Sequence, residues 1–158
     1  SHTSGDIIKA FINYFPAIRN GGMFIAEDLC CSYWKEYEGG IFYSYSAINF
    51  FKTLVDIINF EHWGLDGAKR EDLLAPFQQH FGIKIDPNIL KEIHSVEFIN
   101  SMCIIRKQPS TENTLGKRCI FGKDFIIGRE HLESADESFL VVPSQEENVW
   151  SKKKLSEL

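Results

Sequence analysis

The chain has 158 residues, of which 44% are hydrophobic and 25% charged, so it can build a packed core and is not a disordered segment. Its formal net charge of -5 offers no basic surface for nucleic acid, and no apolar run reaches the roughly 20 residues of a membrane span. Four cysteines without a C-x-x-C pair or zinc spacing indicate reduced thiols, and we expect a cytoplasmic protein.

The first predicted elements are a helix, a glycine turn and a strand. Apolar residues recur at the spacing of one helix face until the pattern stops at residues 16–22: Ile7, Ile8, Phe11, Ile12 and Phe15. Gly21 and Gly22 then end the helix and allow a tight entry into the next element. The apolar run at residues 23–26 predicts a strand of a parallel sheet, buried on both faces.

Two neighbouring acids, Glu27 and Asp28, follow this predicted strand directly. Ligands of open α/β sheets bind outside the carboxyl ends of the strands. Adjacent carboxylates repel each other unless a cation or hydrogen-bond donors satisfy them, so a hard divalent cation is a natural ligand here. The alternative is a solvated acidic turn that opens a loop.

A long loop and a second helix come next. Residues 29–45 are rich in aromatic residues and glycines without helical or strand periodicity, which predicts a loop, and long loops in compact domains are usually functional. Ser46 is the expected cap of the second helix. Its expected apolar stripe ends near Trp63 and comprises Ile48, Phe51, Leu54, Val55 and Ile58.

The remaining chain falls into weaker patterns. Residues 65–86 are charged and mixed, with no firm assignment beyond a short helix and loops around Pro76 and Pro87. Residues 95–98 and 102–105 predict an antiparallel hairpin through Asn100. After a polar linker at 108–114, short strands are expected at 119–121, 125–127 and 139–142, followed by a polar tail. We therefore divide the chain into residues 1–107 and an extension at 108–158.

The predicted order is a helix, a parallel strand, a helix and a final hairpin. This order is typical of the C-terminal part of an α/β, Rossmann-like doubly wound sheet. The chain contains no G-x-G-x-x-G or P-loop pattern. The first half of the sheet, with a cofactor-binding glycine loop, is therefore expected upstream of Ser1.

Several segments, taken in order, resemble one enzyme family. They are residues 1–3, residues 15–29 from Phe15-Pro16 to Glu27-Asp28-Leu29, the Ser32-Tyr33-Trp34 loop, and the hairpin at 93–102. Together they are similar to the C-terminal half of class I S-adenosylmethionine-dependent methyltransferases. The resemblance is to the metal-dependent sugar O-methyltransferases of the mycinamicin and macrocin group, and it covers roughly residues 1–107.

The resemblance implies an O-methyltransferase that uses S-adenosylmethionine and Mg²⁺, or another divalent cation, on a sugar hydroxyl of a glycan or natural product. It implies that Glu27 and Asp28 are metal ligands and that His2 is the general base. The family's third acidic ligand and its S-adenosylmethionine-binding loop would both lie upstream of Ser1. The expected partner is a small-molecule or glycan acceptor, with no nucleic acid and no membrane span, and homo-oligomerisation stays open.

Alternatives stand beside each of these roles. His2 could be left from a cleaved purification tag or be a disordered terminal residue. Tyr33 and Trp34 offer a platform for the apolar face of a sugar, but such aromatic side chains also fill cores. For the whole chain, the alternative is a non-catalytic binding or assembly module that pairs through the exposed edge of a partial sheet. An α/β-hydrolase-like enzyme lacks its G-x-S-x-G motif here.

Overall fold

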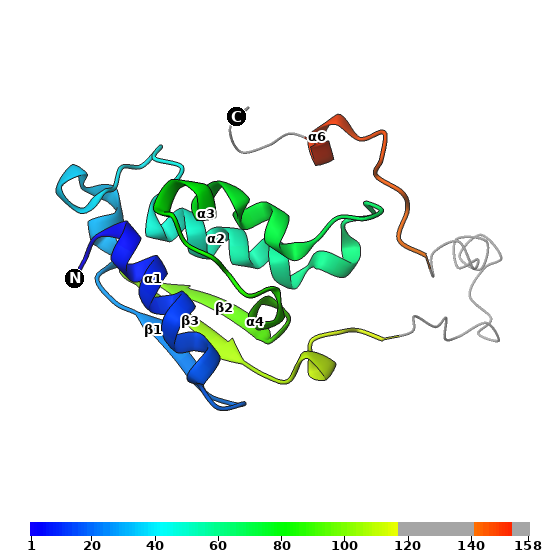
Figure 1. Cartoon of the computed structure of the whole chain (residues 1–158), viewed down its shortest axis with the longest axis horizontal. Helices are drawn as coiled ribbons and strands as arrows, with labels where there is room; N and C mark the ends of the chain where they lie inside the picture. Colours follow the sequence, from blue (N-terminus) through cyan, green and yellow to red (C-terminus); the bar gives the residue numbers. More distant parts are fainter. Residues whose placement is uncertain (117–140, 153–158) are drawn as a thin grey trace, which may run out of the picture.

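The computed structural model describes residues 1–116 and 141–152. Figure 1 shows a small sheet with helices packed on it. Helix α1 (Ser4–Tyr14) leads through η1 (Phe15–Ala17) into strand β1 (Met23–Ala26). The short 3-10 helices η2 (Leu29–Tyr33) and η3 (Lys35–Tyr37) precede helix α2 (Ala47–Ile58).

The elements after α2 are short helices and a hairpin. Turns η4 (Phe60–His62) and η5 (Arg70–Leu74) lead into α3 (Ala75–Phe81) and α4 (Pro87–Lys91). Strands β2 (Ile93–Ile99) and β3 (Met102–Lys107) follow, then η6 (Ser110–Glu112) and, near the C-terminus, α6 (Val149–Lys152). Both α3 and α4 have proline in their first turn, where the missing N–H costs no hydrogen bond.

The three strands are arranged in the order β1-β3-β2, and both neighbouring pairs are antiparallel. The predicted final hairpin is therefore confirmed. Because β3 lies between the other two strands and opposes both, β1 and β2 run in the same direction. No parallel pair occurs among the described residues, so the sheet seen here is antiparallel within a mixed helix and strand fold.

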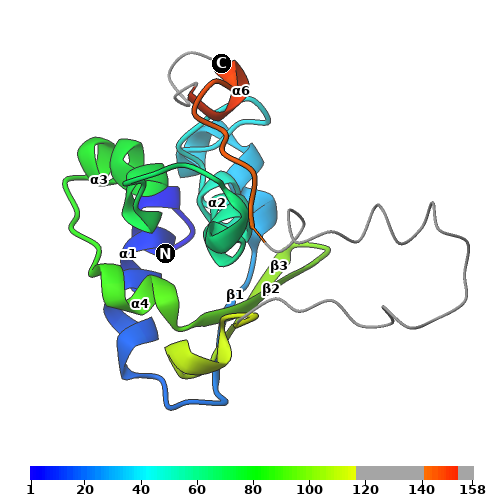
Figure 2. The ribbon, with the colours of Figure 1, turned by 90° about the vertical axis from the view of Figure 1, so that its right-hand side faces the viewer.

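The prediction that residues 23–26 are buried on both faces is wrong for the part of the chain that the structure describes. Figure 2 shows helices α1, α2, α3 and α4 on one side of the sheet. The buried Ala26 and its partner Cys103 face these helices. Met23 and Ile25 lie on the opposite side of the sheet and are 42% and 44% exposed. The continuous apolar run indicated two covered faces, but the described helices cover only one.

The two long helices form where periodicity places them, with one difference of face and one of length: α2 ends at Ile58, before the predicted end near Trp63. The apolar side of α1 is confirmed, since Ile7, Ile8 and Phe11 are buried. In α2 the buried side includes Phe50 and Ile57, while Val55 is 38% exposed, so the predicted stripe was rotated slightly. The aromatic rings of Phe11, Phe15, Phe50, Phe51 and Phe77 fill the centre of the core.

Ser46 occupies the N-cap position of α2 as predicted, but its side chain accepts no cap hydrogen bond. Its buried hydroxyl has no hydrogen-bond partner. The N–H of Ala47 instead donates to the buried Oγ of Ser4 at 2.9 Å. The capping oxygen of α2 therefore comes from the first residue of α1, which joins the two helices at their N-terminal ends.

The described C-terminal segment is less isolated than its polar composition suggests. The Gln145 N–H donates to the Gly64 carbonyl at 2.7 Å, and the Asp66 N–H donates to Glu146 Oε1 at 2.8 Å. Gly64 has a positive φ, and a Cβ there would lie 2.3 Å from the Pro143 carbonyl oxygen. This contact therefore requires glycine.

Part of the predicted C-terminal extension lies outside the described residues. This holds for the expected strands at 119–121 and 125–127 and for residues 139–140 of the third. Val141 and Val142 are described and belong to no strand. Within the described ranges, none of the helices has the length and apolar character that crossing a membrane requires.

Candidate active site

The predicted acidic pair lies at the carboxyl end of β1, on the solvent side. Glu27 and Asp28 are both exposed and directly follow Ala26. Asp28 has a left-handed backbone, with φ of 55° and ψ of 32°. This conformation is uncommon for residues other than glycine and costs free energy, and such residues cluster at functional sites. It turns the chain sharply from the strand into η2.

The hairpin turn between β2 and β3 holds this sharp turn in place. The Leu29 N–H donates to the Ser101 carbonyl at 2.9 Å, and the Cys30 N–H donates to Ser101 Oγ at 3.2 Å. Ser101 itself has a φ of 65°. This support could not be predicted from the sequence, because the partners are about 70 residues apart and only the sheet register brings them together.

The structure brings His2 to the acidic pair. Its Nδ1 lies 3.8 Å from Asp28 Oδ2, with side chains that are 49% and 62% exposed. The His2 ring also meets the Tyr37 ring edge to face, at 5.9 Å between centroids. A histidine beside a carboxylate in partial contact with solvent can accept a proton from a bound ligand.

Helix α1 holds His2 in position through its N-terminus. The Thr3 side chain caps the helix by accepting from the Asp6 N–H at 3.3 Å. Glu38 Oε2 accepts from the Gly5 N–H at 2.9 Å, which also places a negative charge at the positive end of the helix dipole. A Cβ on Gly5 would lie 3.1 Å from the Phe81 ring, so the helix start is closely packed.

Tyr33 and Trp34 follow the acidic pair in the chain, and neither fills the core. They are 43% and 51% exposed. The Trp34 ring lies 6.1 Å from the Tyr37 ring, and Tyr37 in turn touches His2. Ring contacts therefore connect Trp34 through Tyr37 to His2, which lies beside Asp28.

A second aromatic group, missed in the sequence, lies on the other side of the α1 N-terminus. The Tyr43 hydroxyl is 2.9 Å from His80 Nε2, and the Tyr45 and His80 rings stack at 4.1 Å with 3° between their planes. The His80 ring also meets Phe81 edge to face at 4.6 Å. Burial is the main cause that raises the pKa of Tyr43, so its hydroxyl stays protonated at neutral pH.

The donor set at the site limits which metal could bind. Across residues 1–116 and 141–152, no three His, Cys, Asp or Glu side chains gather into a ligand group. Glu27 and Asp28 provide two hard oxygen donors, which is too few for a closed structural zinc site. Two carboxylates do fit Mg²⁺, which commonly takes one or two of them and completes its shell with water and substrate oxygens.

Known proteins with similar sequences are sugar O-methyltransferases. The chain is 36% identical over 79 residues to 8-demethyl-8-(2-methoxy-alpha-L-rhamnosyl)-tetracenomycin-C 3'-O-methyltransferase of Streptomyces olivaceus, a match covering 48% of this chain and 20% of the relative. It is 33% identical over 83 residues to L-olivosyl-oleandolide 3-O-methyltransferase of Streptomyces antibioticus, with the same coverage. No protein-family model matches the chain.

Solved structures with a similar fold include those of one methyltransferase. MycE methyltransferase from the mycinamycin biosynthetic pathway, in complex with Mg and SAH, superposes with a TM-score of 0.55 at 20% identity. The superposition covers 87% of this chain and 30% of MycE. A second MycE structure, with Mg, SAH and mycinamycin VI, has a TM-score of 0.53 at 18% identity.

The matched relatives are much longer than the described chain, which spans about a fifth of the sequence relatives and under a third of MycE. The resemblance to the sugar O-methyltransferases, first seen in the residues around Glu27 and Asp28, is therefore confirmed by both sequence and fold.

Proposed function

We propose that this chain is the C-terminal part of an S-adenosylmethionine-dependent, divalent-metal-assisted O-methyltransferase that acts on a sugar hydroxyl. The expected acceptor is a small-molecule glycoside or a glycan. The relatives named for methylation of rhamnosyl and olivosyl groups support the sugar acceptor, and the Mg and SAH bound to MycE support the two cofactors.

The proposed fold is the end of a Rossmann-like doubly wound sheet. Strands β1 and β2 run in one direction with β3 reversed between them, as a final antiparallel hairpin inserted at the end of a parallel sheet requires. In this fold the free edge of β1 pairs with a preceding parallel strand. The carboxyl end of β1, where Glu27 and Asp28 lie, then faces the ligand crevice.

The single observation that carries the proposed site is the approach of His2 Nδ1 to Asp28 Oδ2 at 3.8 Å. These residues lie at opposite ends of a helix, a turn and a strand, yet the fold brings them together. A solvated acidic turn gives no reason for this pairing, nor for the three hydrogen bonds that fix the start of α1.

Each residue has a separate task in the proposed reaction. Glu27 and Asp28 would hold Mg²⁺, and His2 accepts the proton of the sugar hydroxyl as the oxygen becomes a nucleophile. Tyr33 and Trp34 bind the apolar face of the sugar and turn its hydroxyl toward His2. When bound, the cation lowers the pKa of a coordinated hydroxyl, and S-adenosylmethionine supplies the activated methyl group.

The test uses the protein extended upstream to the length of its relatives. Glu27→Gln and Asp28→Asn keep the side-chain shapes while removing the charges. We expect each to reduce Mg²⁺-stimulated methyl transfer to a rhamnoside by about 100-fold or more, and His2→Gln by roughly 10²- to 10⁴-fold. Initial rates with labelled S-adenosylmethionine measure the effect.

Glu36→Gln is the matched control, because Glu36 is an exposed acid of the neighbouring η3. Its methyl transfer should equal that of the unchanged protein. If Glu27→Gln and Asp28→Asn also left the metal-stimulated rate unchanged, while circular dichroism showed all variants folded, the assignment of the acidic pair would be wrong.

A non-catalytic binding or assembly module is the second candidate, and the exposed apolar side of the sheet favours it. Met23, Ile25 and Ile99 are 42%, 44% and 50% exposed on that side. Such a surface, next to the free edge of β1, invites pairing with another chain. Light scattering of this chain tests the module: association supports it, and a compact, monodisperse monomer contradicts it.

A further inference from the structure

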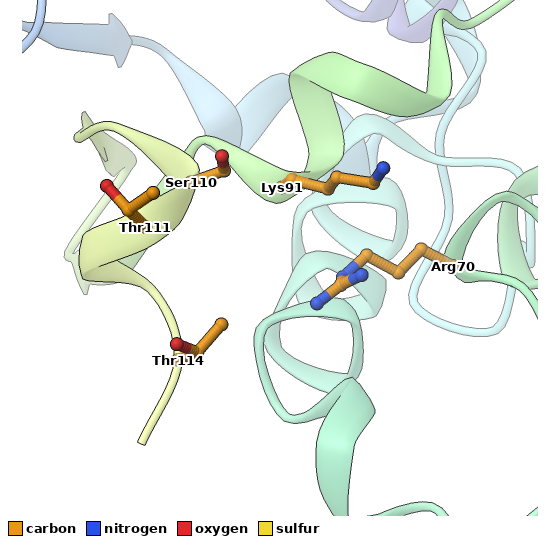
Figure 3. A pocket seen from close by; sticks show the side chains of 5 residues that line it. All are labelled: Arg70, Lys91, Ser110, Thr111 and Thr114. Carbon is orange, nitrogen blue, oxygen red and sulfur yellow. The ribbon is translucent and has the colours of Figure 1, made fainter. Parts of the chain in front are cut away.

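A basic pocket lies at the other end of the sheet from the acidic pair. Its cavity of about 400 Å³ is lined by Arg70, Lys91, Ser110, Thr111 and Thr114. Figure 3 shows the Arg70 guanidinium and the Lys91 ammonium on one side of a space, with the segment that carries Ser110, Thr111 and Thr114 on the other. Two cations and three hydroxyls are hydrogen-bond donors, and no carboxylate belongs to the lining.

The pocket is separate from the proposed active site. Lys91 ends α4, and β2 begins two residues later with Ile93, which pairs with Lys107 at one end of the sheet. Glu27 and Asp28 follow Ala26, which pairs with Cys103 near the opposite end. With seven residues in β2 and about 3.3 Å per residue, the two sites are on the order of 20 Å apart.

Hydrogen bonds between distant segments hold the walls of the pocket together. Asn113 Nδ2 donates to the Lys91 carbonyl at 2.9 Å, which fixes the hydroxyl-bearing segment opposite α4. Asn113 Oδ1 lies 2.8 Å from His94 Nδ1. The Leu115 N–H donates to Glu61 Oε1 at 3.1 Å, which connects the same segment to η4 beside Arg70. The pocket therefore exists before any ligand arrives.

Arg70 is arranged as an anion ligand. Its guanidinium lies over the Phe60 ring at 4.3 Å, so one face is occupied while the N–H edges stay available for a bidentate contact. Loss of hydration lowers its pKa, although Glu61 and Glu71 act in the opposite direction. Among the described residues neither Arg70 nor Lys91 forms an ion pair, so both charges can meet an incoming anion.

We infer that this pocket binds the phosphate group of a small phosphorylated molecule, such as a sugar phosphate. A phosphate has enough oxygens to accept from the guanidinium fork and the ammonium together. The volume exceeds that of a phosphate alone and falls within the range of small-ligand pockets. A cationic cavity on a chain with a net charge of -5 also marks a local and selective site for anions.

Isothermal titration with glucose 1-phosphate, and separately with inorganic phosphate, tests the inference. We expect saturable binding of glucose 1-phosphate, weakened about tenfold by Arg70→Gln and by Lys91→Gln. Arg70→Lys keeps the charge but loses the fork, so it should also weaken binding while the protein stays folded. Lys52→Gln removes a charge from an exposed position on α2 and should leave binding unchanged.

Each result decides the question. Equal losses in Lys52→Gln and Lys91→Gln would show that general charge attraction, not this pocket, binds the anion, and would overturn the inference. No saturable heat with either phosphate probe would overturn it as well. Saturation by inorganic phosphate alone would support the phosphate contacts and overturn the sugar phosphate. None of these results depends on methyl transfer, so the inference and the proposed function succeed or fail separately.

Discussion

Lys107 is a buried cation that joins three parts of the fold. It is 5% exposed, and its Nζ lies 3.1 Å from Glu92 Oε2. The same ammonium donates to the carbonyls of Pro16 at 2.8 Å and Phe15 at 3.3 Å. As the last residue of β3, Lys107 therefore supplies hydrogen-bond donors to carbonyls at the end of α1 and in η1.

We expect Lys107→Met to lower the free energy of unfolding by about 1–3 kcal/mol, because it leaves two carbonyls and a half-buried carboxylate without their donor. Urea denaturation followed by circular dichroism measures the change. Lys52→Met, at an exposed site, should stay within about 0.5 kcal/mol of the unchanged protein. Equal small effects in both variants would contradict a structural role for Lys107.

The buried thiol of Cys103 makes the free energy of unfolding depend on pH in the alkaline range. Burial raises the pKa of its thiol from the ordinary 9.0 to about 12. The native state therefore keeps the neutral thiol between pH 9 and 12, whereas the unfolded chain releases the proton. The stabilising contribution is complete below pH 9 and is lost as the pH rises toward 12.

Relative to Cys103→Ala, the unchanged protein should lose stability over this window, and the difference in unfolding free energy at several pH values measures it.

In native protein at pH 9, iodoacetamide should label the partly exposed Cys30 and spare Cys103, as read by peptide mass spectrometry. Rapid labelling of Cys103 without unfolding would contradict this placement.

At the scale of single residues, chemistry was more predictable than contacts. Glu27, Asp28 and His2 could be selected because their types and order match one family, and the structure places His2 beside Asp28. Ser101 and Glu38 could not be selected, since each acts on a backbone N–H dozens of residues away. A single sequence carries no signal for such long-range partners.

Among the elements, the joint between α1 and α2 shows how one hydroxyl can serve a neighbouring helix. Ser4 Oγ accepts the Ala47 N–H in a fully buried place, while the Ser46 hydroxyl, at the usual capping position, has no partner. The two serines form a matched pair, because both are buried and lie at helix starts.

We expect Ser4→Ala to lower the unfolding free energy by about 1–3 kcal/mol, since it leaves the Ala47 N–H buried without an acceptor. Ser46→Ala removes no hydrogen bond and should change stability by less than about 0.5 kcal/mol, contrary to the usual cost of losing a cap. Thermal unfolding of both variants tests this. A larger loss from Ser46→Ala than from Ser4→Ala would show that the capping roles are reversed.

Periodicity predicted those elements that bury one clear face. Helix α1, helix α2 and the β2–β3 hairpin appear where the sequence indicated. The segment at 65–86 could not be assigned because its helices are short and contribute only a few buried residues such as Leu74 and Phe77. The hydrophobic patterns in this segment are too short to be told apart from chance variation in composition.

For the whole molecule, the open side of the sheet is the main feature that the sequence misjudged. The run at 23–26 is apolar in both directions, which suits a strand with two covered faces, yet the described helices cover one. If the chain is the end of a larger doubly wound sheet, the other face is covered by the upstream part. The face that is exposed here is then the face that the upstream part of the protein would cover.

This idea predicts opposite behaviour in two lengths of the protein. Ile25 is 44% exposed and faces away from the helices, opposite Ile104. In the chain described here, Ile25→Lys should change the unfolding free energy by less than about 0.5 kcal/mol. In the protein extended to the length of its relatives, the same change should cost about 2 kcal/mol or more, because it places a charge in a covered apolar layer.

Val55→Lys is the control, since Val55 is similarly exposed, at 38%, but lies on α2, away from the open sheet face. Its effect should be small at both lengths, because the outer side of a helix layer stays in water. Denaturant unfolding of both variants and the unchanged protein, each at the two lengths, supplies the comparison. An Ile25→Lys effect that stays small in the extended protein would mean that this face of the sheet is a true surface, and the doubly wound arrangement would have to be abandoned.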